Sequence, residues 1–228
     1  MTVGAKLHIL VSAGATREYI DPVRFISNPS TGKMGFEIAR AALAAGHQVT
    51  LVTGPTHLKP PVGAAVISIV SALEMRDAIL EAFPACDVLV MSAAVSDYRP
   101  SKRAHHKIHK SNPSLTLELQ LNPDIIREVQ RKAKGQVLIG FAAETEEHMA
   151  SARQKLENKG LDMIIANDVG GKGVGFAAEH ANAAALFRDG AEKPLGVVTK
   201  ARLGRFIIEQ AEMLVERKRA GARRAWRP

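Results

Sequence analysis

Cysteine and long apolar runs are nearly missing from this chain of 228 residues. Cys86 is its one cysteine, which excludes an intramolecular disulfide and argues against a cysteine-rich metal site. The apolar residues 82–85 before it favour an inert, partly buried thiol over a nucleophile. No apolar run approaches the roughly 20 residues of a membrane span, and the N-terminus has no signal-peptide pattern. We expect a soluble, cytoplasmic protein in a reducing compartment, with no membrane partner.

Two glycine signatures of nucleotide-binding folds are also missing. The fingerprint Gly-x-Gly-x-x-Gly is absent, because a long excursion separates Gly14 from Gly32. Met34 follows Gly32 and Lys33, so the Ser or Thr of a Walker-type phosphate loop is absent too. These absences weigh against an NAD(P)-dependent oxidoreductase on a Rossmann fold, which stays as the less favoured alternative.

The formal net charge of +8 is unevenly distributed. Residues 217–228 hold six basic residues and no acidic one, and without them the charge falls to +2. We expect a basic C-terminal tail that is solvated and frayed. Nucleic-acid binding is a weak alternative, because a charge run alone carries little specificity.

Short apolar runs alternate with segments of helical periodicity, and no internal repeat is present. This pattern predicts an α/β fold: a Rossmann-like, doubly wound, mostly parallel sheet with helices on both faces. We expect ligands at the carboxyl ends of the strands. The expected strands are 7–11, 48–53, 66–70, 88–92, 116–121, 137–142 and 163–166, with a late β-hairpin from 183, and the expected helices are 34–45, 72–83, 123–133, 148–159 and 200–217.

Residues 98–113 interrupt this alternation, and we call them the flap. They are polar and basic and show no hydrophobic periodicity, so we expect a mobile arm. Their histidines, His105, His106 and His109, have no carboxylate or cysteine nearby, so we expect solvent exposure rather than a metal site. Residues 1–216 are expected to form one domain, followed by the tail at 217–228.

The most informative segment is residues 11–35. It leaves a hydrophobic strand at a glycine turn, crosses a polar loop and enters a helix through Ser30, Thr31, Gly32 and Lys33. Such a helix start offers free backbone N–H groups and positive charge. The sequence therefore predicts an anion site there, most plausibly for phosphates.

Seven segments in order closely resemble bacterial phosphopantothenoylcysteine synthetase, the phosphopantothenate-cysteine ligase of coenzyme A synthesis, over residues 7 to about 210. In most bacteria this domain is similar to the C-terminal half of a bifunctional protein whose N-terminal half is a flavin-dependent decarboxylase. That half has no counterpart here, so the resemblance implies a standalone form and a separate decarboxylase as a candidate partner. The segments are residues 12–35, 93–98, 107–110, 122–125, 140–145 and 166–169, together with Lys155 and Lys159.

The resemblance implies a ligase that joins 4′-phosphopantothenate to L-cysteine. A carboxylate is a poor electrophile, and the bacterial family activates it by attack on CTP to give an acyl-cytidylate and pyrophosphate. Cysteine then displaces CMP. The resemblance also implies Mg²⁺ and a homodimer in which an arm of one subunit reaches the other. Eukaryotic relatives use ATP, but residues 142–145 and the lysines of the flap look like the bacterial type and favour CTP.

The resemblance further implies roles for single residues. Asn28 matches the asparagine that holds the acyl-cytidylate, and its amide can donate to an oxyanion. Lys107 matches the flap lysine associated with turnover of the intermediate. The phosphate of phosphopantothenate, or part of the triphosphate, would bind Ser30, Thr31, Gly32 and Lys33. Nucleotide binding carries over onto Gly14, Thr16, Ala93, Asp97, Lys107, Asn122, Pro123, Asp124, Ile125, Phe141, Lys155 and Lys159.

Some of these residues also have a structural explanation. Asn122 is expected to cap the helix at 123–133, with Pro123 in its first turn. Phe141 could belong to the core, and Asn28 could merely shape its loop. Asp97 is expected to contact the ribose or a hydrated Mg²⁺. The ligands of the metal stay unassigned.

Two positions depart from the family pattern. Glu179 stands where the family has Asp, and the surrounding residues 175–182 contain one extra residue. His109 replaces the second lysine of the flap, so its charge depends on pH around the usual histidine pKa of about 6.5.

Overall fold

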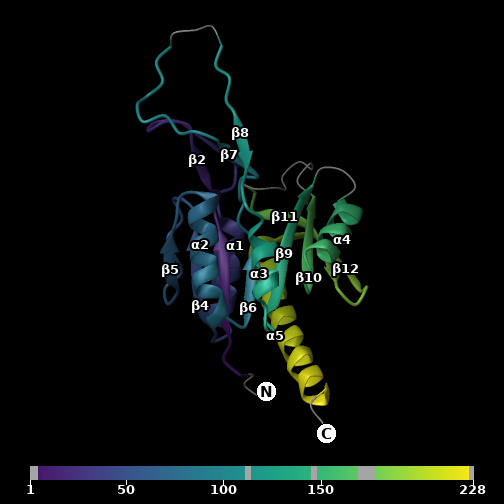
Figure 1. Ribbon diagram of the computed structural model, residues 1–228. Helices are drawn as coiled ribbons and strands as arrows, with labels where there is room; N and C mark the ends of the chain where they lie inside the picture. The colour runs from purple at the N-terminus through teal and green to yellow at the C-terminus, as the bar shows by residue number, and fades with distance from the viewer. Residues whose placement is uncertain (1–4, 111–113, 145–147, 169–177, 226–228) are drawn as a thin grey trace.

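The protein is described here by a computed structural model, which covers residues 5–110, 114–144, 148–168 and 178–225. Its centre is an eight-stranded sheet of order β12-β11-β10-β9-β6-β1-β4-β5 (Figure 1). Neighbouring strands pair in parallel along the series β5, β4, β1, β6, β9 and β10. β11 pairs antiparallel with both β10 and β12. The strands are β1 (His8–Ala13), β4 (Gln48–Thr53), β5 (Ala65–Ser68), β6 (Val88–Met91), β9 (Val137–Glu144), β10 (Met163–Asp168), β11 (His180–Phe187) and β12 (Glu192–Thr199).

Helices cover both faces of this sheet. On one face α1 (Lys33–Ala44) and α5 (Lys200–Ala225) pack against each other and the sheet, and on the other lie α2 (Ala72–Ala82), α3 (Ile125–Lys132) and α4 (His148–Asn158). The central strand β1 is buried on both sides. Ile9 packs in the core on the side of α1 and α5, and Leu10 packs in the core on the side of α2, α3 and α4. The predicted fold class and the late hairpin are confirmed.

Cys86 follows the short 3-10 helix η1 (Phe83–Ala85) and is buried, as expected. Burial, together with the neighbouring Asp87 carboxylate, raises the pKa of its thiol to about 12. Within the described ranges, no helix has both the length and the apolar character needed to cross a membrane.

Two short ribbons stand at the carboxyl edge of the sheet, where the sequence predicted a polar loop, a mobile flap and a strand at 116–121. β2 (Arg17–Tyr19) pairs with β3 (Phe25–Ser27), and β7 (Tyr98–Pro100) pairs with β8 (Leu119–Leu121). The first residues of the flap thus form a strand, and the strand expected at 116–121 is confirmed over Leu119–Leu121. β7 has three residues, too few for a periodic pattern to be recognised.

Asp21 connects the first ribbon to the flap. Its buried carboxylate accepts hydrogen bonds from the backbone N–H groups of Val23, Arg24 and Ile108 and from the Arg24 guanidinium. Burial raises the pKa of Asp21, but these hydrogen bonds outweigh it and hold the pKa well below its ordinary value. The Ala104 N–H also donates to the Ile20 carbonyl. Part of the flap is thus fixed to the turn between β2 and β3.

The expected frayed tail is instead the last part of α5, which continues to Ala225. The Lys218 ammonium lies 2.7 Å from a carboxylate oxygen of Asp162 and donates to the Gln136 carbonyl. The Arg219 guanidinium lies 2.9 Å from the Asp87 carboxylate. These contacts hold basic residues of the helix against the amino edge of the sheet, where solvation alone was expected.

Candidate functional site

The candidate site lies where the strand order reverses. β1 lies between β4 and β6, and the chain continues from β1 toward β4 on one side and from β6 toward β9 on the other. A crevice at the carboxyl ends of such strands is the usual ligand position in doubly wound sheets. Two pockets lie there, and Ala93, Val95 and Phe141 line both.

The first pocket, which we call the α1 pocket, adjoins the start of α1. Gly32 caps this helix with a left-handed backbone, at a φ of 83°, and without a side-chain hydrogen bond. Any side chain at Gly32 would press on the backbone of Gly14, at 3.0–3.1 Å. The pocket is lined by Asn28, Ser30, Gly32, Lys33, Met34, Ser92, Ala93, Ala94, Val95, Phe141, Ala143, Asn167, Ala181, Lys200 and Leu203.

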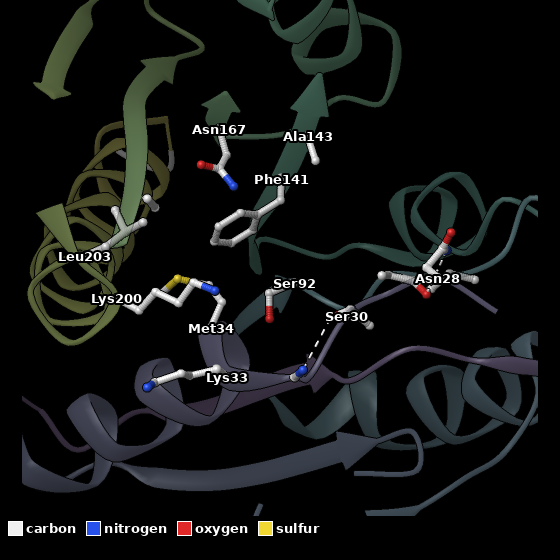
Figure 2. A pocket seen from close by; sticks show the side chains of 15 residues that line it. Asn28, Ser30, Lys33, Met34, Ser92, Phe141, Ala143, Asn167, Lys200 and Leu203 are labelled. Atoms are coloured by element: carbon white, nitrogen blue, oxygen red, sulfur yellow. Dashed lines mark hydrogen bonds between the residues drawn. The ribbon is translucent and has the colours of Figure 1, made fainter. Parts of the chain in front are cut away.

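Asn28 reaches the edge of this pocket because the loops after β1 and β6 are joined. The Ala94 N–H donates to the Gly14 carbonyl, the Thr16 N–H donates to the Ala94 carbonyl, and the Asn28 amide donates to the same Ala94 oxygen at 3.3 Å (Figure 2). Thr16 is buried, and its hydroxyl accepts the Ser96 N–H. Gly14 and Thr16 therefore build the wall of the crevice and do not line either pocket.

Lysine side chains approach the α1 pocket from two elements. Lys33 begins α1 and forms an ion pair with Glu179, and Lys200 begins α5 and is only 4% exposed. Burial lowers the pKa of Lys200, the Lys33 charge lowers it further, and Glu179 acts in the opposite direction. The ion pair with Lys33 lowers the pKa of Glu179. Sequence reasoning missed Lys200, although a lysine at the first position of a helix opposes the helix dipole and is a detectable anomaly.

The second pocket, which we call the α3 pocket, adjoins the start of α3. It brings together eight of the residues expected to bind a nucleotide: Ala93, Asp97, Asn122, Pro123, Asp124, Ile125, Phe141 and Lys159. The pocket is lined also by Met91, Val95, Ser96, Tyr98, Leu121 and Ile126.

Asn122 positions one wall of the α3 pocket rather than capping the helix. Its backbone N–H donates to the Asp97 carbonyl, its amide donates to the Ser96 carbonyl at 2.8 Å, and its side-chain oxygen accepts from Arg99. The helix cap is Asp124, whose carboxylate accepts the Arg127 N–H. The predicted Asn cap is therefore wrong, and Pro123 lies before the cap rather than in the first turn.

Of Lys155 and Lys159, which were both expected to bind the nucleotide, Lys159 reaches the α3 pocket. It follows α4, and its ammonium lies 3.3 Å from the Asp124 carboxylate. Lys155, Thr31 and Lys107 line neither pocket. Lys107 is exposed in the flap, next to the residue that bonds to Asp21. Lys107 does not reach either pocket of its own chain. Its expected role would require the flap to come closer to a pocket.

Phe141 and Asn167 lie at the ends of adjacent strands. Figure 2 shows the Phe141 ring directed into the space between β9 and the start of α1. The side-chain oxygen of Asn167 lines the same pocket, and it is buried with no hydrogen-bond partner among the described residues. Asn167 belongs to a segment that carried the family resemblance, but sequence reasoning gave it no role.

The described ranges contain no group of three or more side chains arranged to hold a metal ion. His105, His106 and His109 are exposed, as expected. The α3 pocket offers the carboxylates of Asp97 and Asp124. Such a pair suits Mg²⁺ that takes its remaining ligands from phosphates and water.

The oxidoreductase alternative has one feature in its favour, since Tyr98 and Lys102 have the Tyr-x-x-x-Lys spacing. Tyr98 lies in β7, however, and Lys102 lies just beyond that strand. The pair is therefore not held on one face of a helix, as residues four apart would be. Tyr98 lines the α3 pocket, whereas Lys102 lines neither pocket.

Comparison with known proteins agrees with the geometry. Residues 5–214 match the DNA/pantothenate metabolism flavoprotein C-terminal domain family. The chain is 42% identical over 208 residues to the coenzyme A biosynthesis bifunctional protein CoaBC of Bacillus subtilis (strain 168), covering 91% of this chain and 51% of that protein. It thus spans about half the length of that curated relative.

Two solved structures have a similar fold. The C-terminal domain of a coenzyme A biosynthesis bifunctional protein CoaBC has a TM-score of 0.81 at 36% identity, over 95% of this chain and 99% of that chain. A Cab2 mutant in complex with phosphopantothenate-cysteine has a TM-score of 0.78 at 17% identity, over 95% of this chain and 89% of that chain, a likeness of fold alone.

Proposed function

Because the chain belongs to the DNA/pantothenate metabolism flavoprotein C-terminal domain family, we propose that it joins 4′-phosphopantothenate to L-cysteine through an acyl-cytidylate made from CTP. One observation carries the proposal. Eight of the twelve residues expected to hold the nucleotide line one pocket, four of the five expected to hold the acid line another, and the two pockets share Phe141. Two reactants bound there would meet at the shared wall.

The α3 pocket is the proposed nucleotide site. Phe141 can present its ring to a pyrimidine, and Lys159 can bind phosphate oxygens once it leaves Asp124. Asp97 and Asp124 are the residues that would hold Mg²⁺, which would neutralise charge on the triphosphate. The carboxylates fit this role because one or two suffice when the substrate supplies the other ligands.

The α1 pocket is the proposed site for the acid. A carboxylate oxygen of the acid attacks the α-phosphorus of CTP, and pyrophosphate leaves. The cysteine amine then attacks the acyl carbon, the acyl–oxygen bond breaks, CMP leaves and the amine loses its proton. Asn28 stands at the edge of this pocket beside Ala94, where its amide can donate to the acyl oxygen without forming a competing ion pair. A Cab2 mutant, which has the same fold, was solved in complex with phosphopantothenate-cysteine.

Pyrophosphate release with CTP and with ATP tests the nucleotide. We expect release with CTP that depends on 4′-phosphopantothenate, and activity with ATP alone would contradict the pyrimidine assignment. Single-turnover assays of Asn28→Ala and Lys107→Gln test the site.

Loss of one oxyanion donor should slow formation or consumption of the acyl-cytidylate about 100-fold or more. Lys102→Gln is the matched control for the flap lysine, because Lys102 is exposed in the same segment and should leave turnover unchanged. If both site variants form and consume the intermediate at the parental rate, the site assignment is wrong.

We also propose a homodimer, in which the flap of one subunit completes the pockets of the other. The ribbon of β7 and β8 and the chain beside it project away from the eight-stranded sheet (Figure 1). The exposed apolar residues of this segment are Tyr98, Leu115, Leu117, Leu119 and Leu121. Such a patch typically marks an interface. Sedimentation equilibrium should give a dimer mass, and Leu119→Lys with Leu121→Lys should give monomers; a monomeric parent would contradict this proposal.

A further inference from the structure

Asp21 is a buried carboxylate outside both pockets. It lies in the turn between β2 and β3, its exposure is 0%, and it lines neither the α1 pocket nor the α3 pocket. Burial of a charged group is costly unless hydrogen-bond donors surround it. The donors around Asp21 therefore indicate what this carboxylate holds in place.

The two oxygens of this carboxylate have different partners. Oδ1 accepts the backbone N–H groups of Val23 and Arg24, each at 2.8 Å, which closes the turn itself. Oδ2 accepts the Arg24 guanidinium and the Ile108 N–H, the latter at 3.1 Å. One oxygen thus forms local structure, and the other holds a residue 87 positions further along the chain.

Ile108 is held by both of its backbone polar groups. Its N–H donates to Asp21, and its carbonyl accepts from the Arg24 guanidinium at 2.7 Å. We call Asp21, Arg24 and Ile108 the clamp. Residues 101–110 belong to no strand or helix, so the clamp fixes a stretch of backbone that no sheet or helix fixes.

Two further contacts join the flap to the same turn. The Ala104 N–H donates to the Ile20 carbonyl at 2.9 Å, and the Arg103 guanidinium lies 5.0 Å from the centre of the Tyr19 ring. Figure 1 shows the flap passing beside the ribbon of β2 and β3. The flap is therefore docked on this ribbon at several points, of which the clamp is the last along the chain among residues 101–110.

The clamp adjoins the flap lysine. Lys107 directly precedes Ile108, so the two Cα atoms are about 3.8 Å apart, while the Lys107 side chain is exposed. Its backbone is thus fixed and its ammonium is available. The same ribbon leads to Asn28, which follows β3 and donates to the Ala94 carbonyl. One small ribbon therefore carries Asn28 and also holds the neighbour of Lys107.

We propose that Asp21 is a positioning residue for Lys107, and that through Ile108 it holds this lysine where it acts in turnover of the acyl-cytidylate. The inference rests on the proposed function and deepens it. Because Lys107 lines neither pocket of its own chain, the clamp would present it to the second subunit of the proposed homodimer. A catalytic group displaced by about 1 Å can lose about 100-fold in rate.

Asp21→Asn is the test variant. An amide keeps the oxygen that closes the turn and places an NH₂ group opposite the Ile108 N–H, where two donors cannot bond. Pyrophosphate release from CTP and 4′-phosphopantothenate without cysteine measures formation of the acyl-cytidylate, and CMP release after cysteine is added measures its consumption. We expect CMP release to slow about 10- to 100-fold and pyrophosphate release to stay within about twofold of the parent. Lys102→Gln, in the same flap, is the control and should match the parent in both steps.

A second pair of variants tests the same bond from the other side. Ile108→Pro removes the N–H that donates to Asp21 and lies in an exposed segment whose change should not unfold the protein. It should slow CMP release as Asp21→Asn does. Ile108→Val keeps the N–H and should retain the parental rate. Thermal unfolding shows whether each variant is folded, and if Asp21→Asn is not, Ile108→Pro decides the question.

The double variant Asp21→Asn with Lys107→Gln distinguishes positioning from a general structural role. If Asp21 acts through Lys107, the double variant should be no slower than Lys107→Gln, whereas independent roles would multiply the losses. Multiplied losses overturn the inference, as does parental CMP release in Asp21→Asn and Ile108→Pro; in both cases pyrophosphate release by the parent leaves the proposed function standing. If the parent releases no pyrophosphate with CTP and the acid, the proposed function fails and this inference fails with it.

Discussion

At the scale of single residues, burial and the nearby Lys33 charge lower the pKa of Lys200. A lysine whose pKa is lowered by folding destabilises the folded state at pH values below that pKa, where the ammonium form dominates. The penalty shrinks as the pH rises from the folded pKa toward the unfolded value of 10.5. We therefore expect Lys200→Met to be more stable than the parent at pH 7, by roughly 1 kcal/mol.

Urea unfolding at pH 7 and at pH 10 measures this difference. The excess stability of the variant should narrow at the higher pH, because the parent then loses its buried charge. A variant that is less stable than the parent at both pH values would show that Lys200 stabilises the fold, contrary to this account.

Which site residues could be predicted depended on whether they lie in local motifs. Ser30, Gly32 and Lys33 belong to one helix start, and Pro123 and Asp124 precede another, so short sequence patterns located them. Lys200 joins Lys33 only after the whole sheet has formed, and no local pattern connects them. The sequence could also not tell which lysine of the pair 155 and 159 reaches a pocket, because that depends on where α4 ends.

At the scale of elements, the close packing of α1 on β1 gives a sharp prediction for Gly35. A Cβ atom there would lie 2.6 Å from the Cβ of Ala13 and 2.8 Å from the hydroxyl of Ser92. The helix would have to move away from the sheet, so we expect Gly35→Ala to lower the free energy of unfolding by about 1–3 kcal/mol. Gly221→Ala is the matched control, because a Cβ at Gly221 on α5 meets nothing within 4 Å and should stabilise the helix slightly. Equal urea midpoints for Gly35→Ala and the parent would contradict the packing described.

The contact of Asp21 with the flap predicts how acid acts on this segment. The pKa of Asp21 is lowered by folding, so its contribution to stability is present above the unfolded value of 3.8 and is lost as the pH falls through the folded value. Asp21→Asn should lose this contribution at every pH above that range. We expect trypsin to cleave the flap of the variant at Arg103 or Lys107 several-fold faster at pH 7, since fewer hydrogen bonds hold Ile108. Parental cleavage rates would show that Asp21 does not fix the flap.

The sequence predicted the main elements better than the small ones. Most long strands and helices bury a continuous apolar face, which leaves a periodic pattern in the chain, whereas the edge strand β12 is largely exposed. The ribbons at the carboxyl edge have three residues in each strand, and they are held by partners far apart in the chain, such as Asp21 and Ile108. The sequence also did not indicate that α5 continues through its basic residues. Those residues pair with Asp87 and Asp162, which lie far away in the chain.

At the scale of the whole molecule, the end of α5 fastens one side of the sheet and lies away from the crevice. Asp162 is 5% exposed, and its carboxylate accepts from the Leu138 N–H and from Lys218. Removal of residues 217–228 would leave this buried carboxylate without its nearest cation. We expect the truncated chain to lose about 1–3 kcal/mol of stability and to keep its ligation rate per folded molecule.

The same truncation tests whether the C-terminal residues take part in the proposed function. Chemical denaturation and pyrophosphate release are measured on the truncated chain, with Lys218→Met as the matched single variant that should show most of the loss in stability. A truncated chain of parental stability would contradict the role given to the Lys218 contact. If ligation disappears while the fold persists, the C-terminal residues act in catalysis and the assignment of the pockets is incomplete.

The turn between β11 and β12 lies at the edge of the sheet remote from the crevice, since β11 runs antiparallel to β10. Gly190 in that turn has open space around it. A fluorophore, an affinity handle or a surface tether attached there would stand clear of both pockets, while the other end of the same hairpin carries Glu179 and Lys200. This turn is therefore a practical place to immobilise or label the protein for measurements of ligand binding.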